Sequence, residues 1–182
     1  AVIQGMCHGK APEAEQTTIE FAEYLRGNMD AIGENRLIPF DRMLRHTQLY
    51  LSLEQKRFGE ALKVCYDIED TDFSLPALAF QPIVENAVRH GVMKKEDGGT
   101  VTILTRKEPE AHLVIVRDDG VGFDPLEVKN DGQSHIGIKN VRERLRVMCN
   151  GTLEIRSVKG QGTEAVISIP AGDERHEDHM RG

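Results

Sequence analysis

The stretch Phe80–Gly91, FQPIVENAVRHG, carries polar side chains of a kind that could bind a metal-chelated phosphate. Residues three and four apart are neighbours on a helix, so Glu85 lies beside Arg89, and Asn86 lies beside Arg89 and His90. The apolar residues of the stretch fall largely on the other side, with the spacing of a core face. A carboxylate, an amide and two basic groups beside a core face suit a magnesium–phosphate site. An ordinary solvated helix face would show the same pattern.

A second candidate group follows a run of β-branched residues. Residues 114–124, VIVRDDGVGFD, predict a buried strand that ends in a glycine turn. Gly120 and Gly122 permit positive φ and close approach of the backbone to a ligand. Asp118 lies where the strand gives way to the turn, and its carboxylate could accept a hydrogen bond from an exocyclic amine. The alternative is a plain β-hairpin with an Asp-Gly turn.

A third group opens a predicted helix. Residues 134–145, SHIGIKNVRERL, place Gly137 at the helix start and basic residues in the first turns. The free N–H groups of a helix N-terminus attract an anion. Cations are poorly placed there unless an anion is bound, so Lys139, Arg142 and Arg144 favour a phosphate ligand. The alternative is the charged face of a surface helix.

A glycine turn at residues 159–164, KGQGTE, joins two strand-like segments and needs no function by itself. Together and in this order, the four groups are far more specific than any one of them. They resemble the motifs of the GHKL ATPases, which include sensor histidine kinases, gyrase-type topoisomerases, heat-shock chaperones and mismatch-repair proteins. Residues 82–91 resemble the asparagine box, 118–122 the D-x-G-x-G first glycine box, 135–140 the second glycine box, and 160–163 the closing G-x-G-T.

Within that superfamily the resemblance is to the LytS/YehU-type sensor histidine kinases. It rests on LPALAFQPIVENAVRHG at residues 75–91, on IGIKNVRERL at 136–145 and on YLSLEQKRFG at 50–59, and it covers about Ile19 to Pro170. The resemblance implies the ATP-binding catalytic region of a two-component sensor kinase. Such a region transfers the γ-phosphoryl group of ATP to a histidine, for relay to a response regulator, here expected to be of the LytTR type.

The resemblance also implies roles for individual residues. Glu85 would orient or deprotonate the attacking nucleophile, and Asn86 would bind Mg²⁺ through its amide oxygen. Asp118 would accept from the adenine amino group, and Thr163 would hydrogen-bond near adenine or its bridging water. The remaining positions would face the phosphates or let the backbone come close to the ligand: Arg89, His90, Gly120, Gly122, Gly137 and Lys139.

Two departures from the family pattern concern histidines. His135 stands where the second glycine box usually begins with glycine, and we expect it to narrow or rigidify a flexible lid at residues 124–135. The H-F-L/I-F-N motif that holds the family's phosphoacceptor histidine does not occur. The chain starts at Ala1 without methionine, so we expect the acceptor upstream of Ala1. His8 and His46 are the alternative acceptors, and neither has the expected surroundings.

Two other functions remain open at this point. One is a GHKL ATPase that hydrolyses ATP for conformational work; the preceding pair of helices and the missing transducer domain count against it. The other is a regulatory module that binds nucleotide without catalysis. The presence of both Glu85 and Asn86 gives no sign of such degeneration.

Composition excludes several classes of protein. The net charge is 23 − 30 = −7 and only 5% of residues are aromatic, which argues against direct binding of nucleic acid. The three cysteines form no metal-like pair or disulfide framework, which fits a reducing cytoplasm, and Cys65 is predicted to be a core strand residue. No stretch approaches the length of a membrane helix. The resemblance to sensor kinases implies a cytoplasmic domain of a bacterial membrane sensor, attached through regions outside this chain.

The pattern of elements predicts an α+β fold. Helices at 14–32 and 39–58 suggest an antiparallel hairpin or dimerisation bundle. The family resemblance implies that residues 1–60 are the remnant of a dimerisation and phosphoacceptor region, and that the full-length protein is a homodimer. Residues 61–171 have the order β-α-β-β-lid-α-β-β, which suits a two-layer α/β sandwich with helices on one face of a mixed sheet, the GHKL or Bergerat fold. Residues 172–182 are expected to be a disordered tail.

Within this domain the sequence makes three further predictions. The first core helix is expected at 75–90, with a kink at Pro82. Strands at 100–105 and 111–118 are expected to pair as one hairpin, and strands at 153–158 and 165–169 as another.

Overall fold

The computed structural model describes residues 11–31, 36–124 and 135–171. The helices are α2 (Ala11–Ala31), α3 (Phe40–Phe58), α4 (Gln81–Asn86) and α5 (His135–Cys149). The strands are β1 (Leu37–Pro39), β2 (Leu62–Ile68), β3 (Ser74–Pro76), β4 (Gly99–Lys107), β5 (Ala111–Asp118), β6 (Thr152–Val158) and β7 (Gly162–Pro170). Short helical turns follow α3 and α4: η1 (Gly59–Ala61), the π-helical turn η2 (Ala87–Gly91) and η3 (Val92–Lys94).

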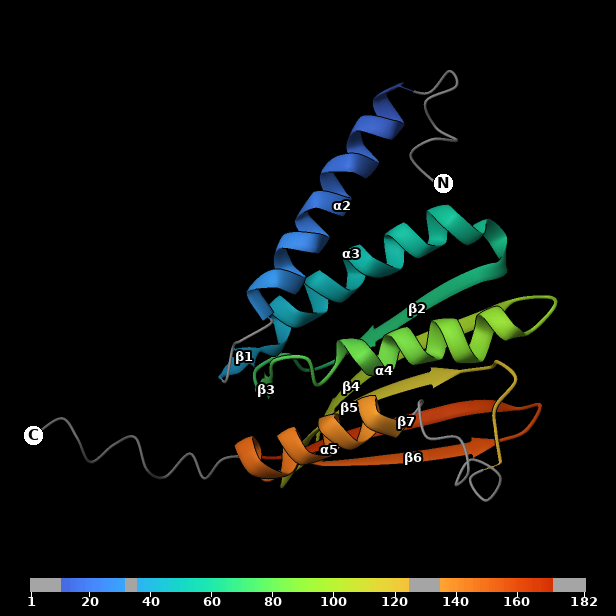
Figure 1. The fold of residues 1–182 in the computed structure, drawn as a ribbon. Helices are drawn as coiled ribbons and strands as arrows, with labels where there is room; N and C mark the ends of the chain where they lie inside the picture. Colours follow the sequence, from blue (N-terminus) through green and yellow to red (C-terminus); the bar gives the residue numbers. More distant parts are fainter. Residues whose placement is uncertain (1–10, 32–35, 125–134, 172–182) are drawn as a thin grey trace, which may run out of the picture.

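Five strands form one mixed sheet in the order β2-β4-β5-β7-β6. The pair β2–β4 is parallel, and every other neighbouring pair is antiparallel. Helices α3, α4 and α5 lie along one face of this sheet (Figure 1). The predicted α+β sandwich, with helices on one face of a mixed sheet, is therefore confirmed. Both predicted hairpins are present as β4–β5 and β6–β7, with ends within three residues of those expected.

The core lies between the helices and the sheet. Alternate residues of β4 and β5 point into it, as expected for a sheet covered on one face. Fully buried side chains from α4 and its N-cap, η2, α5 and the sheet meet there: Phe80, Val84, Val88, Ile103, Leu145 and Ile167. Burial of this apolar surface is the main force that fixes the helices on the sheet.

The first core helix starts later than the sequence predicts. Leu75 and Pro76 belong to β3, which pairs with β1, and the helix begins at Gln81. Pro82 therefore occupies the first helical turn, where its missing N–H removes no internal hydrogen bond. The predicted start at Leu75 and the kink at Pro82 are both wrong, because the proline initiates the helix instead of interrupting it.

Cys65 is the other correction to the predicted core. Its side chain is exposed, although it lies in a strand. Strand β2 is an edge strand of the sheet, and successive side chains of a strand point to opposite faces. Leu62 enters the core, whereas Cys65 lies on the opposite face, which no helix of the described part covers.

Helices α2 and α3 form the predicted antiparallel hairpin. In the first half of α3, His46 Nε2 lies 3.1 Å from the carbonyl oxygen of Tyr24, and near the end of α3, Lys56 Nζ lies 2.5 Å from Glu20 Oε2. The two helices diverge from their shared end beside β1 (Figure 1). No helix in the described ranges is both long and apolar enough to cross a membrane.

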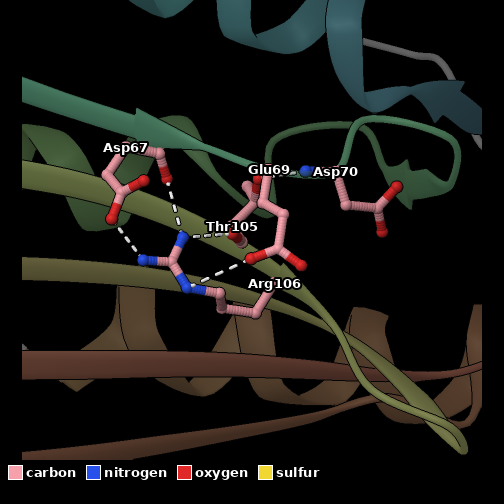
Figure 2. Close-up of polar contacts among 5 residues, drawn as sticks. All are labelled: Asp67, Glu69, Asp70, Thr105 and Arg106. Atoms are coloured by element: carbon pink, nitrogen blue, oxygen red, sulfur yellow. Dashed lines mark hydrogen bonds and ion pairs between the residues drawn. The ribbon is translucent and has the colours of Figure 1, made fainter.

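The loop between β2 and β3 is fastened to the sheet by polar contacts. The backbone N–H of Asp70 donates to Thr105 Oγ1 at 3.0 Å, and Arg106 forms ion pairs with Asp67 and Glu69 (Figure 2). The Asp70 side chain points away from Arg106 (Figure 2) and meets His112 Nδ1 at 2.5 Å. This second pair is buried, so it replaces water contacts that either side chain would otherwise make.

The buried Asp70–His112 pair also lies in a chain of aromatic contacts that reaches α3. The His112 ring stacks on Phe73 with centroids 5.1 Å apart, and Phe73 stacks on Phe40 at 4.7 Å. The backbone N–H of Phe40 donates to the Phe73 carbonyl at 2.9 Å. The loop thus joins the start of α3 to the central strand β5.

We expect acid to weaken the fold through Asp70. Burial by itself would raise the pKa of Asp70, but hydrogen bonds from His112 and the Asp72 amide, with the charges of His112 and Lys107, outweigh it and lower the pKa. A carboxyl whose pKa is lowered by folding stabilises the protein above its unfolded pKa and loses that contribution as pH falls through the folded value. The melting temperature should therefore fall steeply below about pH 4.

Asp70→Asn should reduce this dependence, measured by thermal unfolding from about pH 3 to pH 7. Asp72→Asn is the matched control, since the Asp72 side chain is exposed on the same loop and only its backbone N–H bonds to Asp70. An Asp70→Asn curve that runs parallel to the parent curve throughout would contradict the assignment.

Candidate functional site

The polar residues of α4 and η2 do not share one environment. Glu85 faces α2: its Oε1 accepts from Gln81 Nε2 at 2.7 Å and from the Tyr24 hydroxyl at 3.4 Å. Glu85 and Arg89 also lie close enough to Tyr50 on α3 to act on it. Burial is the main cause that raises the pKa of Tyr50; the nearby carboxylates, Glu85 among them, raise it further, and Arg89 lowers it. The side of the helix that carries Glu85 and Arg89 therefore faces the hairpin of α2 and α3.

Asn86 comes directly after Glu85, and His90 comes directly after Arg89, on the same helical segment. Asn86 is half-buried and His90 is exposed. The segment ends at Gly91, and a Cβ atom there would overlap the carboxyl group of Asp118. The end of the helix carrying Asn86 and His90 therefore lies directly against the end of β5.

Asp118 is the last residue of β5 and is 9% exposed. Its Oδ1 accepts from the Gly120 N–H at 3.0 Å, and the amide and hydroxyl of Thr163, its partner on β7, also donate to the carboxyl group. Burial raises the pKa of Asp118 to about 6; the bonds from Gly120 and Thr163 lower it in part, and the charge of Asp119 raises it. A carboxyl group has thus been placed in a site that disfavours its charge.

The glycines of the two glycine turns allow protein segments to approach one another. A Cβ atom at Gly120 would overlap the backbone of Gly91, and one at Gly122 would overlap the Val158 carbonyl. Gly122 has a φ of 55°. The prediction of positive φ therefore holds for Gly122, whereas Gly120 is required by its contact with Gly91.

Sequence reasoning missed two glycines that help to build this cluster. Gly91 lies against Asp118, and a Cβ atom at Gly162, with a φ of 101°, would overlap the Asp118 carbonyl. The signal was available, because Gly91 closes the asparagine box and Gly162 lies within G-x-G-T. Backbone bonds complete the closure, from Val121 N to the Gly91 carbonyl at 3.3 Å and from Gly160 N to the Val121 carbonyl at 2.6 Å.

The first turns of α5 differ from those that the sequence predicts. The helix begins at His135, two residues before Gly137. Arg142 donates to the Leu153 carbonyl and Arg144 to the Ala77 carbonyl, so both arginines bind the protein backbone. Lys139, the third basic residue of these turns, is exposed. Unlike Arg142 and Arg144, it donates no hydrogen bond to a backbone carbonyl among the described residues.

Gly137 is set apart from the glycines around Asp118. A Cβ atom at Gly137 would have no neighbour within 4 Å among the described residues, so packing does not require glycine there. The predicted lid lies outside the described residues except for Asp124 and the backbone of His135, and the predicted effect of the His135 side chain lies outside them too.

The structure brings Asp118, Gly120, Gly122 and Thr163 into one cluster at one end of the sheet. The C-terminal end of β5, the end of the α4 segment and the β6–β7 turn lie together there (Figure 1). Asn86, Arg89 and His90 are carried on the helical segment that touches this cluster. In the described part of the chain, no group of three histidine, cysteine or carboxylate side chains could hold a metal ion. A cation at this site would need other oxygen ligands, such as an amide and phosphates.

Three curated relatives match most of this chain. YwpD of Bacillus subtilis strain 168 is 36% identical over 92% of the chain, and the sensor histidine kinase YpdA of Escherichia coli K12 is 34% identical over 86%. The sensor protein LytS of Bacillus subtilis is 28% identical over 99% of the chain. The chain spans 62% of YwpD, 28% of YpdA and 32% of LytS, so it corresponds to part of each relative.

A solved structure has the same fold. The histidine kinase domain of the blue-light activated histidine kinase of Erythrobacter litoralis EL346 superimposes with a TM-score of 0.54 at 24% identity, covering 69% of this chain and 59% of that one.

Family models cover both halves of the chain. The family described as histidine kinase matches residues 1–62, and the family described as histidine kinase-, DNA gyrase B- and HSP90-like ATPase matches residues 71–173. The second match includes every predicted site residue from Glu85 to Thr163. The chain belongs to this ATPase family and, within it, to the sensor histidine kinases of the LytS, YpdA and YesM type.

Proposed function

We propose that this chain binds ATP and Mg²⁺ and transfers the γ-phosphoryl group to a histidine upstream of Ala1, for relay to a response regulator of the LytTR type. The observation that carries the proposal is the buried Asp118 carboxyl at the end of β5, held by Gly120 and Thr163 beside the end of the asparagine-box helix. The match to the ATPase family supports the nucleotide as ATP.

Asp118 suits recognition of adenine. An ionised carboxylate only accepts hydrogen bonds, so it would pair with the adenine amino group and would repel the carbonyl that guanine presents at the same place. Gly120 and Thr163 already fix its position, and burial strengthens a hydrogen bond made there. Thr163 would also hydrogen-bond near the base, because its hydroxyl lies against the same carboxyl group.

The triphosphate would extend from this cluster along α4 and η2 towards α5. Asn86 would contribute an amide oxygen to Mg²⁺, which prefers oxygen ligands and retains several waters. Arg89, His90 and Lys139 are exposed cations or proton donors that would neutralise phosphate oxygens. The first N–H groups of α5 around Gly137 would add the positive end of a helix, and no described residue lies within 4 Å of a Cβ atom placed at Gly137.

Glu85 would act on the nucleophile. As the imidazole nitrogen bonds to the γ-phosphorus, the bond to the bridging oxygen breaks and ADP leaves with the electron pair. The proton on the other imidazole nitrogen would be held or taken up by the Glu85 carboxylate. Its position supports this role, because Glu85 faces the helical hairpin and not the Asp118 cluster.

His46 is poorly placed to be the acceptor. Its Nε2 lies 3.1 Å from the Tyr24 carbonyl and its ring stacks on the Tyr24 ring at 5.3 Å. Among the other histidines, His112 is buried against Asp70, and His8 lies outside the described residues. These surroundings count against His46 and His112 as the acceptor.

The division into three parts and the homodimer are also proposals. Residues 1–60 would be a dimerisation region, 61–171 the ATPase domain and 172–182 a tail. On α2, the apolar residues Phe21, Leu25 and Met29 recur every four positions and are 43%, 44% and 73% exposed. A second copy would bury this stripe. Attachment to a bacterial membrane would come through regions outside this chain.

Asp118→Asn should weaken ATP binding and reduce the preference for ATP over GTP, since the amide also presents donors. It should also raise the melting temperature at about pH 8. Folding raises the pKa of Asp118 to about 6, so its stabilising contribution is present at low pH and is lost as pH rises through that value. The neutral amide avoids this loss, worth on the order of 1–3 kcal/mol.

Calorimetric titration with each nucleotide and thermal unfolding at about pH 4 and pH 8 would test both effects. Asp97→Asn is the control, because Asp97 is exposed in the loop before β4 and is not among the charges that act on Asp118. Full ATP affinity and full ATP preference in Asp118→Asn would show that Asp118 does not bind adenine.

Asn86→Ala should remove most of the magnesium dependence of ATP binding, and Asn86→Asp should alter it, because each changes a neutral oxygen ligand. The measurement is ATP affinity across a Mg²⁺ titration, with circular dichroism to confirm folding. Gln48→Ala on the exposed face of α3 serves as the control. Magnesium curves that match the parent in a folded Asn86→Ala variant would count against this ligand.

Residues 1–182 alone should bind γ-labelled ATP without retaining acid-labile phosphate, whereas the natural chain with its upstream segment should become labelled. In that longer chain Glu85→Gln should slow labelling by about 100-fold or more, because an amide cannot take up the proton. Rapid-quench phosphorylation measures both. Stable phosphohistidine at His8 or His46 in residues 1–182 would make one of them the acceptor.

A further inference from the structure

We infer that Gln81 is the positioning residue for the Glu85 carboxylate, assisted by Tyr24 from the helical hairpin. This inference rests on the proposed role of Glu85 in phosphoryl transfer. The three side chains form a closed triangle, with Gln81 Nε2 lying 2.7 Å from Glu85 Oε1 and 3.2 Å from the Tyr24 hydroxyl oxygen. The Tyr24 hydroxyl completes the triangle at 3.4 Å from Glu85 Oε1.

Both hydrogen bonds to the carboxylate go to the same oxygen, Oε1. They fix the rotation of the carboxylate about its long axis and leave Oε2 as the oxygen not used by either bond. Gln81 and Tyr24 therefore select which oxygen faces the attacking nucleophile. A general base must lie within hydrogen-bond reach of the proton that it takes, so loss of this orientation slows transfer without weakening ATP binding.

The distances and burial indicate that Gln81 contributes more than Tyr24. The 2.7 Å bond joins an amide donor to an ionisable carboxyl group, and Gln81 is 9% exposed, so water competes little for it. Gln81 and Glu85 are also one helical turn apart, so they are neighbours on α4. The 3.4 Å contact from Tyr24 is long for a hydroxyl donor, so its effect is smaller.

Tyr24 connects this arrangement to the helical hairpin. It lies on α2, stacks on His46 and Tyr50 of α3, and reaches α4 through its hydroxyl. A shift of α2 that withdraws Tyr24 leaves Glu85 Oε1 with the Gln81 bond alone. The position of the hairpin thus acts directly on the orientation of the base.

The same junction provides a matched control. Tyr50 stacks on Tyr24 with ring centroids 5.8 Å apart and is 6% exposed. Its hydroxyl is buried and has no hydrogen-bond partner within the part of the chain that the structure describes. Tyr50→Phe removes one hydroxyl oxygen from the junction, as Tyr24→Phe does. Unlike Tyr24→Phe, it breaks no hydrogen bond to Glu85.

The test is the rate of histidine phosphorylation in the natural chain with its upstream segment. Gln81→Leu keeps the side-chain volume and removes the donor, and it should lower kcat about tenfold or more with KM for ATP unchanged. Tyr24→Phe should lower kcat about threefold, and Tyr50→Phe should leave kcat unchanged. Thermal unfolding of each variant, and ATP affinity in the same samples, separate misfolding from misorientation.

A double-mutant comparison decides whether Gln81 and Tyr24 act through Glu85. In the Glu85→Gln background, Gln81→Leu and Tyr24→Phe should cause no further loss, because the oriented group is already gone. Further losses equal to those in the parent, or a fall in ATP affinity that accounts for the whole effect, would overturn the inference. If Glu85→Gln keeps the full rate, the proposed role of Glu85 fails. If Glu85→Gln is slow but Gln81→Leu and Tyr24→Phe keep the full rate, Glu85 is the base but Gln81 does not position it.

Discussion

The structure depends on the close approach of three backbone segments around Asp118. The end of η2 meets the turn after β5 at the Gly91–Gly120 contact, and the β6–β7 turn closes over the Asp118 carbonyl at Gly162. Each contact leaves no room for a Cβ atom, so side chains are excluded for steric reasons before any ligand is considered. This closure buries the Asp118 carboxyl and raises its pKa, and the same closure fixes the end of the helix that carries Asn86 and His90.

The remainder of the sandwich holds these segments in register. Pairing of β5 with β7 sets Asp118 opposite Thr163, and packing of Phe80, Val84 and Val88 against the sheet sets the direction of α4. On the far side, the Asp70–His112 pair and the stacked Phe73 and Phe40 rings tie the loop after β2 to the start of α3. The Asp118 cluster and this attachment of α3 therefore lie near opposite ends of the same strand, β5, which carries both Asp118 and His112.

The junction between the hairpin and α4 is built differently from the Asp118 cluster. It is lined by long polar side chains, namely Tyr24, Glu54, Gln81, Glu85 and Arg89, and it includes a buried tyrosine hydroxyl without a partner in the described ranges. An unpaired buried hydroxyl costs free energy in this arrangement of the helices. This is the side of α4 on which Glu85, the proposed base, faces α2.

The sequence by itself determined the fold class, the order of the elements and most of the Asp118 cluster. Alternating apolar residues specify the strands of both hairpins, and glycines at fixed spacing mark the turns, because few other residues permit those backbone conformations. The start of α4 was misplaced, because an apolar run cannot distinguish β3 from a helix turn when the deciding fact is pairing with the distant strand β1.

Only the tertiary structure decided which way each polar side chain faces. Helical spacing put Glu85 and Asn86 on one side, but the packing of α2 turned Glu85 towards Tyr24, and Gln81 gained its contact with Glu85 there. Arg142 and Arg144 were expected to meet phosphate, yet they bind the carbonyls of Leu153 and Ala77. Two of these partners, Tyr24 for Glu85 and Ala77 for Arg144, lie 61 and 67 residues away in sequence, and their positions depend on long-range packing that local patterns of residues do not encode.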